Sequence, residues 1–409
     1  MGVSTLTAFA GVTRDPAGYA LGGVEPAHAL RPASTGEATE VVRACVADRL
    51  ALVPWGGGVA LAGERFPGRY DVALDLTALD RITHYEPDDF TVTAECGVTL
   101  ATLRATLLAH GHELPLEAAS AARATLGGVL AANASGARRL RFGSPRDRIL
   151  GARFATGDGV LARTGGRVVK NVAGHAVHRL LTGSRGGLGV LLEASLKLTP
   201  LPPARVALAF GADAAALADP ALWAGFARRE PAFCTVLGRD AATALGAFDT
   251  GAPFTVVLGW EDDAAWVGEC ERFATARLGE PAQRTEDEGV PPLTQLLADA
   301  EEERPGPRLA FASAHHSPAA LAKLAALPDA ARLVFHAPHG RLLWWPSAES
   351  AAEVSAACAH RGFRRTEARA LALPREAQAP ALRALRAELR RALDPAGTFA
   401  FGDRWERGE

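Results

Sequence analysis

Cysteine is scarce in this chain of 409 residues. Its five cysteines, Cys45, Cys96, Cys234, Cys270 and Cys358, are widely spaced, and no two of them form a CxxC pair. The odd number and the spacing argue against a disulfide framework, a zinc site or an iron–sulfur cluster. We therefore expect buried thiols in a reducing compartment and no bound metal.

Long blocks of one charge and long apolar runs are also missing. The 44 basic and 46 acidic side chains leave a net charge of −2, so charge alone would not recruit nucleic acid or a membrane surface. No run is long enough to span a bilayer, and the first residues lack the pattern of a secretory signal. We expect a cytoplasmic protein without direct membrane insertion, and peripheral association with the inner membrane through partners stays open.

Glycine, in contrast, is abundant and gathers in three places. At the first, a short apolar strand, Ala51–Pro54, runs through Trp55 directly into Gly56, Gly57 and Gly58. Successive N–H groups in such a turn can form a nest that suits a pyrophosphate, and an ordinary flexible turn is the alternative. The spacing matches neither a P-loop nor a Rossmann fingerprint.

The second and third glycine-rich places lie further along the chain. Thr125–Gly128 opens a short apolar helix, whose free N–H groups we expect to face outward. Gly165–Pro200 ends in a strand-like segment, Gly189–Lys197. Dense glycine indicates a close approach of the backbone to a ligand or to a neighbouring strand, and the repeated turns favour a ligand.

Arginines cluster just after the second glycine-rich place. We expect most of them to lie on a solvated surface, with one or two pairing with phosphate or with an acidic partner surface. The cluster consists of Arg138, Arg139, Arg141, Arg146 and Arg148.

The length predicts two compact domains, the first ending at the prolines up to Pro203. Spacing predicts helices over Ala33–Leu50, with Ser34 and Glu37 as a capping box, and over Thr99–His110. After Pro203 we expect an antiparallel sheet with helices on one face. Its elements are strands Val206–Phe210, Phe233–Leu237, Phe254–Trp260, Leu309–Ser313, Leu333–His336 and Leu342–Trp345, and helices Ala214–Arg228, Ala264–Leu278, Glu349–Arg361 and Glu376–Leu393.

Six motifs occur in a characteristic order: GGG, TLGG, NASG, GSPRD, KNVAG and GSRGGLGVLLEASLKL. Together they resemble the PCMH-type FAD-binding domain of the vanillyl-alcohol oxidase family, and most of all the FAD-binding subunits of bacterial glycolate oxidases. The resemblance implies an α+β protein. It implies a two-domain PCMH-type FAD-binding fold of two α/β subdomains over residues 1–203, an antiparallel-sheet α+β cap domain over 204–380, and a C-terminal segment, 381–409, that returns to the FAD domain.

The resemblance also implies which residues hold FAD. It implies three groups of residues. The first group, at the glycine turn, would cradle the pyrophosphate, and the second would follow the ribityl chain and ring or support the same cleft. The third would brace the site or contact the flavin through its backbone. The residues are Pro54, Gly56, Gly57, Gly58 and Val59; Pro115, Glu117, Thr125, Gly127, Gly128, Asn133, Ser135, Gly136 and Asp147; and Lys170, Asn171, Gly189 and Val190. No histidine occurs in the first glycine turn, so we expect non-covalent FAD.

A catalytic site is harder to find. Oxidation of a 2-hydroxy acid needs a proton acceptor and cations that hold the carboxylate. The best candidates are His336, His339 and Arg341, although two incidental histidines in a turn are the simpler interpretation. The histidine motifs of the catalytic subunits in this family are not found.

Three functions remain open. In the first, the chain is the FAD-binding subunit of a glycolate oxidase complex, supporting electron transfer or assembly with a catalytic flavin subunit and an iron–sulfur subunit. In the second, it is a self-sufficient FAD-dependent oxidoreductase of a 2-hydroxy acid or alcohol. In the third, it is a scaffold subunit without flavin.

Overall fold

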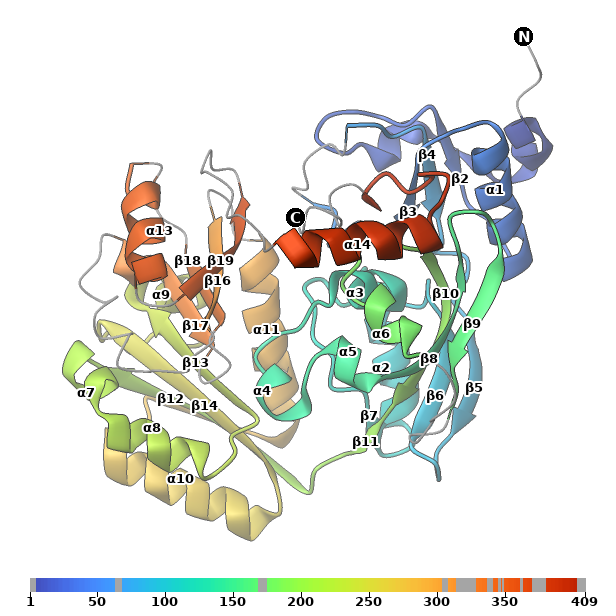
Figure 1. The fold of residues 1–409 in the computed structure, drawn as a ribbon. Coiled ribbons are helices and arrows are strands. Elements are labelled where there is room, and N and C mark those ends of the chain that lie inside the picture. Colours follow the sequence, from blue (N-terminus) through green and yellow to red (C-terminus); the bar gives the residue numbers. More distant parts are fainter. Residues whose placement is uncertain are drawn as a thin grey trace. The chain divides into compact units, whose positions relative to one another are not determined.

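The computed structural model describes residues 5–62, 68–167, 175–303, 308–313, 329–336, 341–344, 347, 349–360, 363–369 and 380–402. The chain divides into two compact units (Figure 1). The first contains Met1–Ala134, Ser144–Leu201 and Ala377–Glu409, and the second contains Ser135–Gly143 and Pro202–Glu376. The excursion of residues 135–143 into the second unit lies before the boundary predicted at Pro203.

The first unit begins with a small, mostly parallel sheet. Its strand order is β1 (Thr13–Arg14), β2 (His28–Leu30), β4 (Val72–Asp75) and β3 (Leu52–Trp55), with β2, β4 and β3 parallel. Helix α1 (Thr35–Ala47) covers it through Val41, Val42 and Cys45, which are fully buried. The Ser34 side chain accepts a hydrogen bond from the Glu37 N–H at 3.1 Å, as predicted.

A five-stranded antiparallel sheet forms the rest of the first unit. Its order is β5 (Ile82–Glu86), β6 (Thr91–Glu95), β10 (Val190–Lys197), β8 (Ile149–Ala155) and β9 (Leu161–Gly165). Leucines of α2 (Leu100–Leu108) and α3 (Leu126–Ala132) share one core with it. The other elements here are β7 (His112–Glu113), α5 (Pro145–Arg148), α6 (Val177–Leu181) and β11 (Thr199–Pro200).

The end of the chain also packs on the first unit. After helix α14 (Pro380–Leu393), the buried Asp394 carboxylate accepts the N–H groups of Thr398 and Phe399 at 2.7 and 3.2 Å. Phe399 then forms a parallel bridge with Leu52 of β3. Buried backbone groups of β3 are thereby paired by a segment more than three hundred residues later.

The second unit is built on one antiparallel sheet of eight strands. Its order is β15 (Gln283–Glu286), β12 (Ala204–Ala212), β14 (Phe254–Asp262), β13 (Phe233–Gly238), β17 (Leu333–His336), β18 (Arg341–Trp344), β16 (Arg308–Ser313) and β19 (Phe363–Arg369). The expected strands are present. Strands β15 and β19, which carry many charged residues, were not predicted because they lack an apolar alternation.

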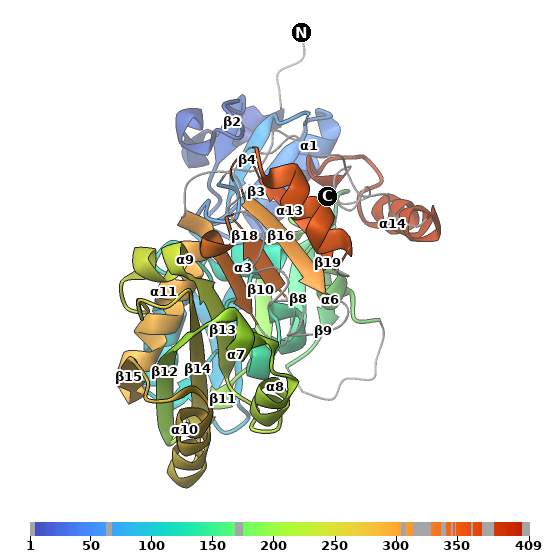
Figure 2. The same ribbon diagram turned by 90° about the vertical axis from the view of Figure 1, so that its left-hand side faces the viewer.

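Helices cover both faces of this sheet, so the prediction of helices on one face is wrong. One face packs on α7 (Ala214–Ala218), α8 (Pro220–Ala227), α10 (Ala264–Leu278) and α13 (Ala351–His360). Figures 1 and 2 show α10 lying beside β12. The other face packs on α9 (Arg239–Leu245), α11 (Val290–Glu303) and Ala137, next to α4 (Arg139–Phe142).

One predicted helix is split. Residues 214–228 form α7 and α8, because Asp219 adopts an extended conformation and its side chain accepts the N–H of Ala221. Pro220 then occupies the first helical position, where its missing N–H costs nothing.

Candidate functional site

The first glycine turn lies at the carboxyl ends of two parallel strands. Strand β3 ends at Trp55, paired with Asp75 at the end of β4, and the glycines follow at once. A β-carbon on Gly57 would lie 1.7 Å from the Arg123 carbonyl oxygen, and one on Gly56 would lie 2.2 Å from Thr125 Oγ1. Only glycine allows this approach of the two segments.

The turn leaves backbone donors available. Gly58 has a φ of +74°, and none of the hydrogen bonds in the described part of the chain uses the N–H of Gly57, Gly58, Val59 or Ala60. The residues that carry these donors are partly exposed. Successive free N–H groups in a turn are the chemistry that binds a phosphate or pyrophosphate anion, so the turn fits this part of FAD.

The start of helix α3 behaves differently from the prediction. The N–H groups of Leu126 and Gly127 donate to the carbonyls of Val98 and Cys96 at 2.8 and 2.7 Å, and that of Gly128 donates to Thr125 Oγ1 at 3.3 Å. The expectation of free N–H groups at this helix is therefore wrong. Position 127 requires glycine because a β-carbon there would lie 2.8 Å from the β-carbon of Cys96.

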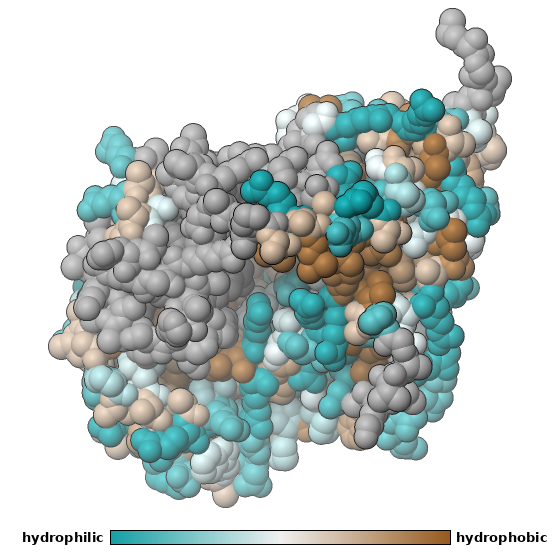
Figure 3. Space-filling model, in the orientation of Figure 1, coloured by the Kyte–Doolittle hydropathy of each residue, from teal (hydrophilic) through white to brown (hydrophobic). Residues whose placement is uncertain are grey.

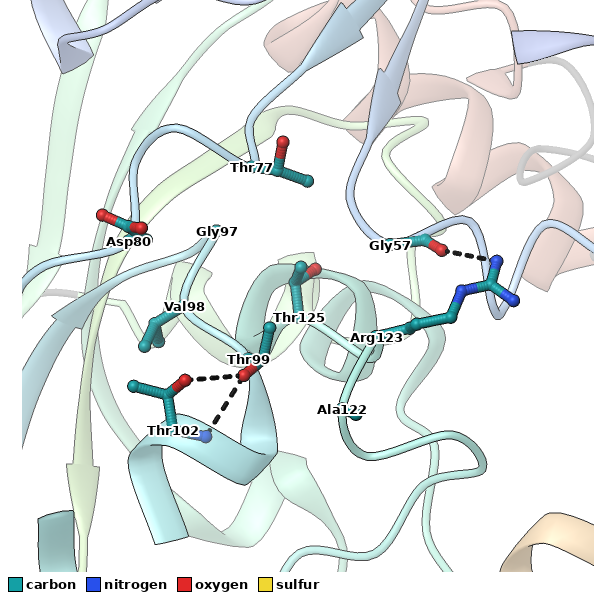
Figure 4. A pocket seen from close by; sticks show the side chains of 10 residues that line it. All are labelled: Gly57, Thr77, Asp80, Gly97, Val98, Thr99, Thr102, Ala122, Arg123 and Thr125. Carbon is teal, nitrogen blue, oxygen red and sulfur yellow. Dashed lines mark hydrogen bonds between the residues drawn. The ribbon is translucent and has the colours of Figure 1, made fainter. Parts of the chain in front are cut away.

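A pocket of about 300 Å³ opens beside these segments (Figure 4). Threonine hydroxyls dominate its polar lining, and Figure 4 places Asp80 and Arg123 on opposite sides of it. The lining residues are Gly57, Thr77, Asp80, Gly97, Val98, Thr99, Thr102, Ala122, Arg123 and Thr125. Hydroxyls, one carboxylate and one guanidinium can hydrogen-bond the sugar and phosphate groups of a nucleotide.

Only Gly57 and Thr125 of this lining were predicted as cofactor residues. Thr99 was predicted only as the first residue of a helix, and its Oγ1 accepts the Thr102 N–H at 3.1 Å. Thr77, Asp80 and Arg123 carry no local motif. They reach the pocket because Leu76 N–H donates to the Trp55 carbonyl and Leu100 N–H donates to the Ala124 carbonyl, which are long-range contacts.

Other predicted cofactor residues are spread over the first unit. Pro115 and Glu117 are buried in the stretch that follows β7. Asn133 caps α3 with a φ of +50°, and its Oδ1 accepts the Arg146 N–H at 3.3 Å. Asp147 accepts from Ser144 at the start of α5.

Four predicted residues stand apart from this group. Ser135 and Gly136 belong to the second unit, unlike Asn133. Lys170 and Asn171 lie outside the described residues.

The close approaches at the third glycine-rich place are to protein. A β-carbon on Gly186 would lie 3.0 Å from Pro54 Cγ, and one on Gly187 would lie 2.8 Å from the Phe401 carbonyl oxygen. At Gly189 it would meet Phe154 and Leu181, and Val190 is fully buried. Packing thus explains the small residues, and a contact of the Gly189 and Val190 backbone with FAD remains a prediction.

Of the three catalytic candidates, His336 has no access to solvent. Its Nδ1 lies 2.9 Å from Thr235 Oγ1 on the neighbouring strand. Its strand partner on the other side is Arg341, by backbone register. His339 lies outside the described residues.

All five cysteines are buried, as predicted, and none of them forms a disulfide with another. Burial raises the pKa of the Cys45 and Cys234 thiols to about 12 and that of Cys270 to about 11. Such thiols are protonated at neutral pH and make poor nucleophiles. Along the described ranges, no helix combines the length and apolar character needed to cross a bilayer.

Comparison with known proteins identifies the glycine-rich segment. Residues 26–165 match the family model of an FAD binding domain. The chain is 40% identical over 171 residues to glycolate oxidase subunit GlcE of Escherichia coli (strain K12), which covers 41% of this chain and 48% of that one. It is 34% identical over 178 residues to a D-2-hydroxyglutarate dehydrogenase of Xanthomonas citri pv. viticola, covering 43% and 38%.

Two further comparisons define the extent of the likeness. Glycolate oxidase subunit GlcD of Bacillus subtilis (strain 168) is 33% identical over 184 residues, covering 45% of this chain and 39% of that one. The chain thus spans about half or less of these curated relatives. A solved structure of alkyldihydroxyacetonephosphate synthase, 16% identical, superimposes with a TM-score of 0.68 over 93% of this chain and 77% of that one, which shows a shared fold.

The matching family, the ordered motifs and the free donors of the first glycine turn agree. Residues 26–165 of this chain therefore carry an FAD-binding domain of the PCMH type, and FAD is the cofactor of that domain.

Proposed function

We propose that this chain is the FAD-binding subunit of a glycolate oxidase complex that oxidises a 2-hydroxy acid. It would support electron transfer or assembly beside a catalytic flavin subunit and an iron–sulfur subunit. The similarity to a glycolate oxidase subunit at 40% identity supports this assignment, and the similarity to a D-2-hydroxyglutarate dehydrogenase supports a 2-hydroxy acid as the substrate.

The first unit supplies the cofactor site. We propose that the N–H groups from Gly57 to Ala60 hold the pyrophosphate, and that the hydroxyls of Thr77, Thr99 and Thr102 face the remainder of the nucleotide half. Bound FAD supplies a two-electron acceptor. The chain's own groups bind and orient it, without a proton transfer by any described side chain.

The observation that carries the subunit assignment is the burial of His336 in the second unit. His336 has no exposed surface, and helices cover both faces of its sheet. A general base must reach the proton that it removes. Within the described part of the second unit, the side chain best suited to that role is engaged with Thr235.

Exposed leucines support a role in assembly. Leu382 and Leu385 on α14 are 39% and 52% exposed, and Figure 3 shows apolar residues gathered around this helix. Exposed apolar surface flanked by charge is typical of protein contacts. An iron–sulfur cluster would have to come from another chain, because the five cysteines here are buried and dispersed.

A self-sufficient oxidoreductase is the second candidate. It is favoured by the similarity to a D-2-hydroxyglutarate dehydrogenase, whose name does not describe it as a subunit. In that case, the catalytic groups would include His339 and Arg341. A flavin-free scaffold is the third.

One preparation separates the three. The purified chain is supplied with FAD, its visible spectrum is recorded after gel filtration, and glycolate or D-lactate is then added without oxygen. We expect bound oxidised flavin that substrate leaves unchanged until the partner chains are added. Bleaching by substrate in the isolated chain would contradict the subunit proposal, and absence of flavin would favour the scaffold.

A further inference from the structure

We propose that Arg123 is a positioning residue of the FAD site, which holds the carbonyl of Gly57 so that the glycine turn keeps its donors toward the pyrophosphate. This inference deepens the cofactor assignment and rests on it. Arg123 belongs to no motif of the first glycine turn and is 66 positions away from Gly57.

The contact between the two segments has two parts. Arg123 Nη2 donates to the Gly57 carbonyl oxygen at 3.1 Å, and Figure 4 shows the guanidinium directed at this carbonyl. In the opposite direction, the Arg123 carbonyl lies where a Gly57 side chain would be. The backbone at Arg123 therefore fixes where Gly57 lies, and the side chain fixes which way its carbonyl points.

The segment that carries Arg123 is itself well anchored. The N–H groups of Arg123 and Ala124 donate to the Ser120 carbonyl at 2.7 and 2.8 Å, forming a tight turn. The Ala124 carbonyl accepts the N–H of Leu100 at the start of α2 at 2.9 Å. Arg123 thus acts from a rigid support and not from a free loop.

Holding this carbonyl matters for an anion. The carbonyl and the following N–H belong to one planar peptide and point in opposite directions. If the Gly57–Gly58 peptide turned over, a carbonyl oxygen would replace a donor in the nest and would repel the pyrophosphate. Glycines make such a turn easy, so the unbound site needs an external restraint.

The neighbouring helix offers no substitute. The first N–H groups of α3 are all used within the protein, by Val98, Cys96 and Thr125. The site therefore depends on the turn, and the orientation of the turn depends on Arg123.

The test compares FAD affinity among variants, followed by flavin fluorescence. Arg123→Met keeps the aliphatic stem and removes the donor, and Arg123→Lys keeps a donor of similar reach. Arg163→Met is the matched control, since Arg163 is an exposed arginine on β9. We expect Arg123→Met to raise the dissociation constant of FAD about tenfold or more, because a hydrogen bond from a charged donor is lost. We expect Arg123→Lys to restore most of the affinity and the control to change nothing.

Two further measurements separate positioning from simple attraction. The weakening in Arg123→Met should persist at about 0.5 M salt, where charges more than roughly 5 Å apart are screened. The unfolding midpoint of the FAD-free chain should stay as in the wild type. If Arg123→Met does not fold, Arg123→Gln takes its place in the same titration.

The outcomes distinguish the two proposals. A wild-type chain that binds no FAD would overturn the cofactor site itself. A wild-type chain that binds FAD while Arg123→Met binds equally well would overturn only the role of Arg123. If the loss of FAD affinity disappeared at high salt, or if Arg163→Met showed the same loss, the effect would be one of charge alone. Either result would also reject the positioning role of Arg123.

Discussion

Arg138 and Glu261 form a bidentate ion pair, with Nε and Nη2 each 2.6 Å from a carboxylate oxygen, although 123 positions separate them. Both are buried, at 7% and 2% exposed. Arg205 Nε adds a second cation at 3.3 Å from the same carboxylate, and Arg141 pairs with Asp262 beside it. Arg138 and Arg141 thus fasten the short segment 135–143 to the end of β14 within the second unit. For these two arginines, a purely solvated surface is excluded.

We expect Glu261→Ala to lower the free energy of unfolding by about 3–5 kcal/mol, because it leaves buried arginines without a counter-charge. Urea unfolding of the intact chain measures this. Glu269→Ala is the control, since Glu269 is an exposed partner of Arg229 and should cost less than about 1 kcal/mol. If both variants lowered the free energy of unfolding by the same amount, the buried ion pair would contribute no more to stability than the exposed one.

Gly57→Ala should abolish FAD binding or weaken it by more than about tenfold, because a methyl group cannot fit against the Arg123 carbonyl. Gly111→Ala serves as the control: Gly111 has a φ of +74° with no atom within 4 Å. That variant should lose about 1–2 kcal/mol of stability from backbone strain and bind FAD normally. Flavin titration and thermal unfolding check both, and normal FAD binding by Gly57→Ala would contradict the geometry of the turn.

Stability should fall at mildly acidic pH because of His178. This side chain is buried with Nδ1 3.3 Å from Thr164 Oγ1, and burial, followed by the nearby Arg179 charge, lowers its pKa. In the unfolded chain, imidazole titrates near pH 6.5, so below about that pH the unfolded state binds a proton that the folded state does not. The stability that neutral His178 contributes is fully present above the pKa of this side chain in the unfolded state. It is lost as the pH falls toward the pKa of His178 in the folded state.

The comparison for this prediction is between two histidines. In His178→Gln, the stability difference between pH 7 and pH 5 should be smaller than in the wild type. His175→Gln should leave it unchanged, because His175 is exposed. Denaturant unfolding at the two pH values gives the result, and identical pH profiles for wild type and His178→Gln would refute the assignment.

Asp394→Ala should release the returning segment from β3. The carboxylate accepts two backbone N–H groups in a buried position, and Thr398 Oγ1 donates to the Gly157 carbonyl at 2.8 Å. We expect a loss of about 2–4 kcal/mol, since buried donors are left unsatisfied. Amide hydrogen exchange of residues 394–402 should rise, whereas Asp158→Ala in an exposed turn should not change it. Unchanged protection in Asp394→Ala would reject this role.

Local patterns predicted much of the first unit. Ser34 and Thr99 cap helices because their hydroxyls meet N–H groups only three residues later. The strand alternation up to Lys197 and the order of glycine motifs were sufficient to indicate the family, because these features are local. In the second unit, the helix Ala264–Leu278 was predicted with its exact bounds in the same way, from the spacing of its apolar residues.

The sequence by itself determined the positions of the glycine turns relative to the predicted strands. That order was enough to predict the FAD-binding domain, because the absence of a side chain at a turn can be read directly from the sequence. Only the tertiary structure decided which glycines serve the ligand. Gly127 and Gly189 make room for protein, whereas the turn at Gly57 and Gly58 keeps free donors. The reason is physical: the carbonyls of Val98 and Cys96, the Arg123 guanidinium and the Glu261 carboxylate reach their partners across 28 to 123 positions, and contacts of that range follow from the fold and not from local spacing.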